Sequence, residues 1–224
     1  MTEPNRDGAA SPSSPGMRRS DPAAFFAAVQ EPSADRVKAI LADDPTLVSI
    51  RNEGGTALHF AAIANDRAMV DTLLAAGAHL DARDDTYQMT PIGWANEEGH
   101  VEMVRYLYER GAEVDLHRAA AYGLLDRVKE LVKGPRRQVN ALVGGWTALQ
   151  LATVWGQSEV VELLLSKGGD PLVKDPYGRT TLELARSQIE TGGKSTPLVR
   201  DERRQAILAG CAKIVELLEQ RGPR

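Results

Sequence analysis

Residues 145–168 read GWTALQLATVWGQSEVVELLLSKG, which is the pattern of two short helices joined by a turn. Thr147 is placed to cap the first helix, and Gly156 is placed to end it. A second apolar run follows and stops at Gly168, where a left-handed residue favours the end of a helix. Helices of about eight or nine residues are only marginally stable alone. The unit therefore needs neighbours of its own kind.

Such neighbours recur along the chain. The tetrad TALQ at 147–150 is repeated as TALH at 56–59, TPIG at 90–93 and TTLE at 180–183, with a degraded copy, VDLH, at 114–117. The first residues of the five copies are 34, 24, 33 and 33 residues apart. Four copies also carry a valine 14 residues after their first residue, namely Val70, Val104, Val128 and Val161. Two landmarks at a fixed offset indicate an internal repeat.

A period near 33 residues with a Thr-Pro-Leu-His-like tetrad is the signature of ankyrin repeats. On these motifs the chain resembles the ankyrin-repeat family from about residue 21 to the C-terminus. The resemblance implies an all-α fold, an ankyrin-repeat solenoid of about six helical hairpins with short β-turn or β-hairpin fingers, in which the first hairpin is a diverged cap. It also implies a protein–protein interaction scaffold that holds a partner protein in its concave groove and is not an enzyme.

The domain organisation follows from the same pattern. Residues 1–20 are rich in Pro, Ser, Gly and charge, and we predict a disordered tail there. The ankyrin-repeat domain is predicted over residues 21–224. In the last repeat Val215 lies 35 residues after Thr180 instead of 14, which indicates an insertion of about 21 residues around 189–209. Its start is rich in turn residues, and from Asp201 it has a helical pattern. We expect its deletion to leave a folded array.

The copy that begins at Val114 is shortened. It follows Glu113 directly, so the finger that should precede it is missing. We expect a step in the row of fingers and a break in the groove at this point. The sequence KGPRR at 133–137 then forms a small basic turn, which is predicted to be a solvated loop and is an alternative contact for an acidic partner.

Composition excludes several classes of function. The net charge of −4 argues against general nucleic-acid binding, which normally shows a basic excess. No apolar run approaches the roughly 18 residues of a membrane span. A single cysteine, Cys211, excludes an internal disulfide and fits a reducing compartment. We therefore expect a cytoplasmic protein, a monomer, without cofactor or membrane partner.

One short motif suggests catalytic chemistry. Gly193-Lys194-Ser195 matches the end of a phosphate-binding loop, G-x-x-x-x-G-K-[ST], but the leading glycine should stand where Gln188 does. The motif also follows a helical pattern instead of a strand, and Pro197 comes two residues after it. A nucleotide-dependent switch or an enzyme that uses this insertion is the alternative to the scaffold. The four histidines and one cysteine form no catalytic set.

His59 in the best-formed tetrad is predicted to be structural. In the ankyrin family the histidine of the tetrad bonds to the threonine hydroxyl and to neighbouring backbone. A metal site at His59 has no support, because no second His or Cys lies nearby at ligand spacing. Trp94 is predicted to be core between repeats.

The candidate contact residues come from the family's pattern, which places finger tips just before each tetrad. They are Arg83, Asp85, Tyr87, Trp146, Tyr177 and Arg179. Tyr, Trp and Arg are the residue types that dominate binding hot spots. For Trp146, packing on the next finger is an equal alternative. The C-terminal group of Trp146, Tyr177 and Arg179 is expected to be the principal contact because it holds more anchors.

Overall fold

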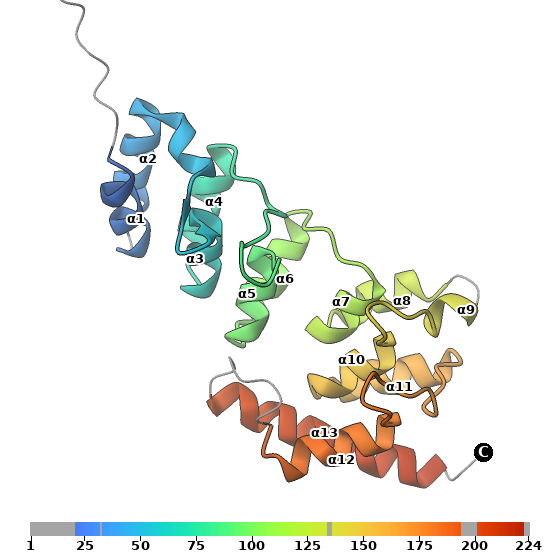
Figure 1. Cartoon of the computed structure of the whole chain (residues 1–224). Helices are drawn as coiled ribbons and strands as arrows, with labels where there is room; N and C mark the ends of the chain where they lie inside the picture. Colours follow the sequence, from blue (N-terminus) through green and yellow to red (C-terminus); the bar gives the residue numbers. More distant parts are fainter. Residues whose placement is uncertain (1–20, 32, 134–135, 194–200, 222–224) are drawn as a thin grey trace, which may run out of the picture.

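The computed structural model describes residues 21–31, 33–133, 136–193 and 201–221, without the side chains of Arg136 and Arg137. Over these residues the chain forms six pairs of antiparallel helices stacked side by side (Figure 1). The pairs are α1 (Pro22–Gln30) with α2 (Ala34–Asp43), α3 (Ala57–Ile63) with α4 (Arg67–Ala75), α5 (Pro91–Glu97) with α6 (Val101–Glu109), α7 (Leu116–Tyr122) with α8 (Leu125–Leu131), α10 (Ala148–Val154) with α11 (Ser158–Ser166), and α12 (Thr181–Glu190) with α13 (Asp201–Arg221). The predicted all-α solenoid, with its diverged first hairpin, is confirmed.

Short irregular elements join the pairs. A two-stranded hairpin, β1 (Arg51–Asn52) and β2 (Gly55–Thr56), forms the first finger, and a single bridge between Val143 and Trp146 forms another. A 3-10 helix, η1 (Pro45–Ser49), follows α2, and a one-turn helix, α9 (Arg136–Val139), follows α8. The predicted β-hairpin and β-turn fingers are therefore present.

A polar residue occupies the N-cap of the first helix of each pair, and from α7 onward its side chain accepts a hydrogen bond from the helix. Thr147 accepts from the backbone amide of Gln150, whose side chain accepts in turn from the amide of Thr147. Thr180 and Glu183 form the same capping box. In the degraded copy the helix begins one residue later than the tetrad predicts. Val114 has no acceptor in its side chain, so Asp115 caps α7 and accepts from the amide of Arg118.

The repeated apolar positions form one continuous core. The tetrad leucines Leu58 and Leu149 are fully buried, and so are Val70 and Val161. The inner helix of one pair packs on the inner helix of the next, α3 on α5 and α10 on both α7 and α12. Each pair buries its apolar face only against its neighbours, as the shortness of the helices requires.

The array changes direction at the shortened repeat. Six residues, 110–115, connect α6 to α7, whereas fifteen, 76–90, connect α4 to α5. The predicted loss of a finger is confirmed. Helices from α7 onward lie across the direction of the helices before them (Figure 1). Tyr122 of α7 packs closely on Gly93 of α5 across this step. A Cβ added to Gly93 would lie 3.3 Å from the Tyr122 hydroxyl.

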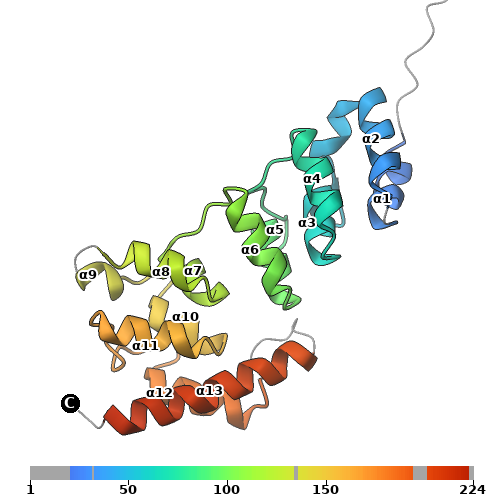
Figure 2. The same ribbon diagram turned by 180° about the vertical axis from the view of Figure 1, so that it is seen from behind.

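The insertion lengthens the last hairpin and takes part in the core. Its helical part is the start of α13, which packs on α10, α11 and α12. Ile207 is fully buried there, and Arg203 reaches α5, where it donates to Asn96 Oδ1 at 3.4 Å. Figure 2 shows this end of α13 close to the ends of α5 and α6. Deleting the insertion would remove these core contacts, and that the shortened array still folds stays a prediction.

Several sequence-based predictions fall outside the described residues. These are the disordered tail at 1–20, the Lys194 and Ser195 of the phosphate-loop motif, and part of the basic turn at 133–137. Among the helices that the structure does describe, none is both long and apolar enough to cross a bilayer.

His59 has the structural role that the family resemblance implies. Its Nδ1 accepts a hydrogen bond from the backbone amide of Thr56 at 3.1 Å. The ring proton is therefore on Nε2, which donates to the carbonyl of Met89 at 3.0 Å. Burial lowers the pKa of His59 and so favours this neutral form, although the bond to Met89 and the charge of Asp84 oppose the shift. The ring thus ties α3 to the finger that precedes α5.

Replacing His59 by alanine is expected to lower the free energy of unfolding by about 1–2 kcal/mol. The substitution leaves the Thr56 amide and the Met89 carbonyl without their partner in a buried place. Urea unfolding followed by circular dichroism measures the loss. His79→Ala is the control, since His79 is exposed. Equal midpoints for the two variants would contradict the structural role.

Candidate partner-binding hollows

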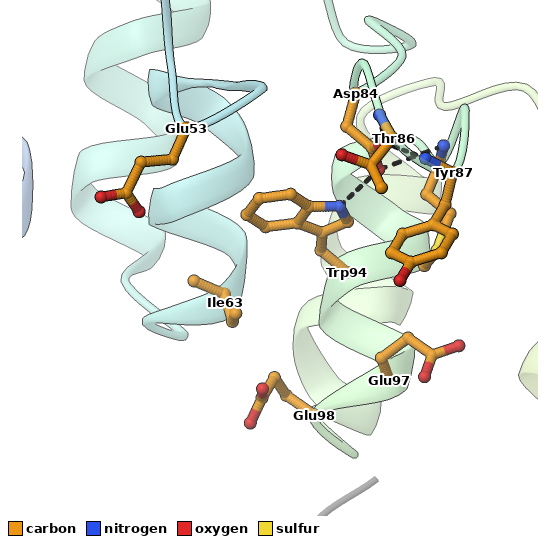
Figure 3. A pocket seen from close by; sticks show the side chains of 9 residues that line it. Glu53, Ile63, Asp84, Thr86, Tyr87, Trp94, Glu97 and Glu98 are labelled. Atoms are coloured by element: carbon orange, nitrogen blue, oxygen red, sulfur yellow. Dashed lines mark hydrogen bonds between the residues drawn. The ribbon is translucent and has the colours of Figure 1, made fainter. Parts of the chain in front are cut away.

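Two hollows lie between inner helices and fingers, one in each half of the array. The N-terminal hollow, between α3 and α5, has a volume of about 290 Å³. Its lining comprises Glu53, Ile63, Asp84, Thr86, Tyr87, Met89, Trp94, Glu97 and Glu98. Figure 3 shows the indole of Trp94 at its centre, with Tyr87 on one side and Glu53 on the other. Of the residues predicted for this half, only Tyr87 lines the hollow.

Asp84 holds the finger above the N-terminal hollow. Its side chain accepts from the backbone amides of Thr86, Tyr87 and Met89, at 2.9, 2.6 and 3.2 Å, and from the indole Nε1 of Trp94 at 2.8 Å. Burial disfavours the charged carboxylate, but these hydrogen bonds outweigh it and hold the pKa of Asp84 below its usual value. The finger conformation and the Trp94 side chain therefore depend on one buried carboxylate.

Arg83 and Asp85 are exposed and stabilise the finger from outside. Arg83 Nη1 donates to the carbonyl of Gln88 at 2.9 Å. Asp85 pairs with Arg51 of the preceding finger at 3.0 Å. Arg83 thus stabilises its own finger and Asp85 joins two fingers, and Tyr87 is left as the exposed aromatic of this half, at 64% exposure.

Trp94 was predicted to be core between repeats, and the structure gives it a second role. Its ring makes edge contacts with His59 and Phe60, with centroids 4.9 and 5.6 Å apart. The ring also lies against Gly55, where a Cβ would stand 2.9 Å from Cη2. The remaining surface of the indole forms the wall of the N-terminal hollow.

The C-terminal hollow brings together three of the predicted contact residues. Its volume is about 420 Å³, and it is lined by Trp146, Leu151, Val154, Tyr177, Arg179, Leu184 and Gln188. The rings of Trp146 and Tyr177 meet edge to face with centroids 6.3 Å apart. The guanidinium of Arg179 lies 5.0 Å from the centre of the Tyr177 ring. Trp146 is half-buried and Tyr177 is 77% exposed.

Asp175 organises the finger before α12 as Asp84 organises the finger before α5. It is buried, and it accepts from the amides of Tyr177 and Arg179 at 2.9 Å each. It also forms an ion pair with the guanidinium of Arg179 at 2.8 Å. Arg179 therefore both lines the hollow and neutralises a buried carboxylate. Asp84 and Asp175 lie at the finger tips in the sequence, but their supporting role was not predicted, although Asp-Asp-Thr-Tyr and Asp-Pro-Tyr-Gly are turn signals.

A third hollow, of about 280 Å³, lies at the step between the halves, where Gly93 and Glu97 of α5 face Ala121 and Tyr122 of α7. The missing finger leaves this hollow between the N-terminal and C-terminal surfaces. Among the described residues, no group of three or more His, Cys, Asp or Glu is placed to hold a metal ion.

Comparison with known proteins agrees with this architecture. A family model described as ankyrin repeats (3 copies) matches residues 24–116 and 116–191. The chain is 31% identical over 182 residues to the ankyrin repeat protein YahD of Escherichia coli (strain K12), which covers 75% of this chain and 90% of that protein. It is 26% identical over 135 residues to the E3 ubiquitin-protein ligase Ufd4 of Drosophila melanogaster, which covers 60% of this chain and 4% of that protein.

A solved structure has the same fold. The crystal structure of EF0377, an ankyrin repeat protein, matches with a TM-score of 0.56 and 25% sequence identity over 89% of this chain and 98% of the other. Together with the repeat register and the stacked hairpins, these matches show that the chain belongs to the ankyrin-repeat family.

Proposed function

We propose that this protein is a non-catalytic scaffold that binds a partner protein through its fingers and concave groove, with the C-terminal hollow as the principal contact. Ankyrin repeats are a general protein–protein interaction module, and that much follows from the family. The observation that carries the finer proposal is the convergence of Trp146, Tyr177 and Arg179 on one hollow.

The geometry of these three side chains favours binding. Tyr177 is a large aromatic group in contact mostly with solvent, yet its ring is oriented by Trp146 and Arg179. A side chain held in place before binding loses less conformational entropy when a partner covers it. Aromatic and arginine anchors beside an apolar hollow are typical of interface hot spots.

The partner is proposed to be a protein that is not yet identified, and not a nucleic acid or a membrane. The acidic net charge of −4 supports this choice. We further propose that the protein acts in the cytoplasm, since its single cysteine fits a reducing compartment, and that it acts as a monomer.

A nucleotide-dependent switch or an enzyme at the insertion is the less favoured function. The segment that leads to Gly193 is helix α12, whereas a phosphate-binding loop follows a strand. A thermal-shift screen with ATP, GTP and divalent metals separates the two functions. Stabilisation by more than about 2 kcal/mol at saturating nucleotide would support the switch.

Tyr177→Ala is expected to weaken binding of a partner identified by affinity capture and mass spectrometry by about 1–3 kcal/mol. Titration calorimetry with the purified partner gives the change in Kd. The melting temperature should stay close to that of the wild type because the Tyr177 side chain is exposed. Leu172→Ala is the matched control, since Leu172 is 62% exposed and lies outside the hollow.

Arg179→Ala is expected to weaken binding to a similar extent and also to lower stability, because Asp175 loses its ion pair. Comparison with Tyr177→Ala separates the loss of a direct contact with the partner from the loss of the ion pair that supports the finger. If both variants bind normally and substitution of Arg136 or Arg137 abolishes binding, the principal contact is the basic turn instead of the hollow.

A further inference from the structure

The last pair of helices contacts a pair that is not its neighbour. In a solenoid each repeat normally packs only on the repeats beside it. Here Arg203, in the first turn of α13, donates from Nη2 to Asn96 Oδ1 of α5 at 3.4 Å, although the fourth and fifth pairs lie between them in the array. Figure 2 shows the start of α13 close to the ends of α5 and α6. The sixth pair therefore contacts the third directly.

This contact crosses the step, where the two halves of the array, α1 to α6 and α7 to α13, meet loosely. The inner helix α3 packs closely on α5, and α7 packs closely on α10, whereas among the described helices α5 and α7 do not approach each other to this extent. Tyr122 packs directly on Gly93 across the step, beside a hollow of about 280 Å³. A further contact is needed to hold the two halves at one angle.

We propose that residues 201–211 of α13 act as a strap that holds the two halves of the array at a fixed angle across the step. The N-terminal hollow lies in the first half and the C-terminal hollow in the second, so the strap also fixes the distance between them. The strap acts within this chain, and it therefore goes beyond the proposed function and requires no partner.

One end of the strap is the Arg203 side chain, which contacts both halves. Its aliphatic stem lies on the turn between α5 and α6, where a Cβ added to Gly99 would stand 3.1 Å from the Cβ of Arg203. Its guanidinium carbon lies 5.7 Å from the centre of the Trp155 ring, at the end of α10. Burial lowers the pKa of Arg203 and the charge of Glu97 opposes the shift, so this carboxylate of α5 attracts the guanidinium. Arg203 therefore joins α5 to α10.

The other end of the strap is fixed to the C-terminal half. Ile207 and Cys211 are fully buried and pack together with Trp155. The Sγ of Cys211 donates to the carbonyl of Thr153 in α10 at 3.3 Å. Residues four apart lie on one face of a helix, so Arg203 continues the face that Ile207 and Cys211 turn toward α10. The buried end of the helix thereby positions Arg203 at the step.

Distances between spin labels on the two halves test the strap in the full chain. Glu109→Cys in α6 and Glu162→Cys in α11 place the labels at exposed positions of outer helices on either side of the step. The native Cys211 is buried, and burial raises the pKa of its thiol to about 11, so the introduced cysteines react in preference. Double electron–electron resonance then gives the distribution of distances between the labels, and a single narrow peak is expected.

Arg203→Ala is expected to broaden or displace this peak by more than its wild-type width, because it removes the contacts with α5 and with Trp155. Arg186→Ala is the matched control and should leave the peak unchanged. Arg186 also binds α13, through an ion pair with Glu219 at 2.7 Å, but it joins α13 to α12 within the C-terminal half. Arg203→Met, which keeps most of the stem and removes the charge, serves if circular dichroism shows that the alanine variant does not fold.

Three results would overturn the strap. One is a peak in the folded Arg203 variant with the wild-type mean and width. Another is equal broadening in Arg186→Ala, which would mean that any loosening of α13 frees the two halves. The third is a broad distribution in the wild type itself. None of these results depends on partner binding at Tyr177, so failure of the strap and failure of the proposed function are distinguishable.

Discussion

Gly210→Ala is expected to lower the free energy of unfolding by at least about 3 kcal/mol, although alanine is the better helix former. Gly210 lies in the middle of α13, where its backbone crosses the turn between α10 and α11. A Cβ at this position would lie 1.8 Å from the carbonyl oxygen of Gly156. The crossing is reciprocal, because a Cβ on Gly156 would lie 2.5 Å from the carbonyl oxygen of Ile207. Both obstructing atoms belong to the backbone, so no rotamer change relieves the clash.

The sign of the effect makes this prediction discriminating. If α13 were a loosely attached helix, Gly210→Ala would stabilise the protein by roughly 1 kcal/mol through helix propensity. The exposed neighbour Ala209 provides the control, since Ala209→Gly should cost only about that propensity difference. Urea unfolding of the three proteins measures both values. A Gly210→Ala protein as stable as the wild type would show that α13 does not pack on Gly156 in this way.

The repeat register was predictable because it is written in local signals. A capping residue, a buried apolar residue and a glycine that ends the second helix recur at nearly the same places in most copies, as in Thr147, Leu149 and Gly168. The missing finger was predictable for the same reason, because it shortens the spacing between the tetrads at Thr90 and Val114. The one-residue shift of the cap from Val114 to Asp115 needed a further step, which was to ask which side chain can accept a hydrogen bond.

The sequence predicts a helical segment in the insertion but not its place in the core, because packing against another repeat leaves a weak local signal. Residues 201–221 have a helical pattern, but nothing in the sequence says that Ile207 and Gly210 face the turn at Gly156. The same limit applied to the candidate site. Tyr177 and Trp146 were recognisable as finger residues, whereas the wall formed by Trp94 depends on how α5 lies beside α3. Asp84 and Asp175 are recognisable as finger-tip residues, but which carboxylate of a finger turns inward to accept the backbone amides depends on the folded turn.

Asp84→Ala is expected to destabilise the protein by about 2–4 kcal/mol, since it leaves three backbone amides and the Trp94 indole without their acceptor at a position that is 2% exposed. Asp85→Ala removes only a surface ion pair with Arg51 and should cost less than about 1 kcal/mol. The two neighbours are therefore a matched pair, and chemical unfolding compares them directly.

The effect should also depend on pH with a defined sign. The folded-state pKa of Asp84 lies below its ordinary value of 3.8, so the folded state binds this proton less tightly than the unfolded chain does. Its contribution to stability is fully present above the unfolded pKa and is lost as pH falls through the folded pKa. Wild type and Asp84→Ala should therefore differ most near neutral pH and approach each other in acid. A gap that stays constant down to strongly acidic pH would mean that the hydrogen-bonded carboxylate does not hold the finger. The same substitution should also shift the NMR signal of the Trp94 indole Nε1–H, because this group donates a hydrogen bond to Asp84 in the folded protein.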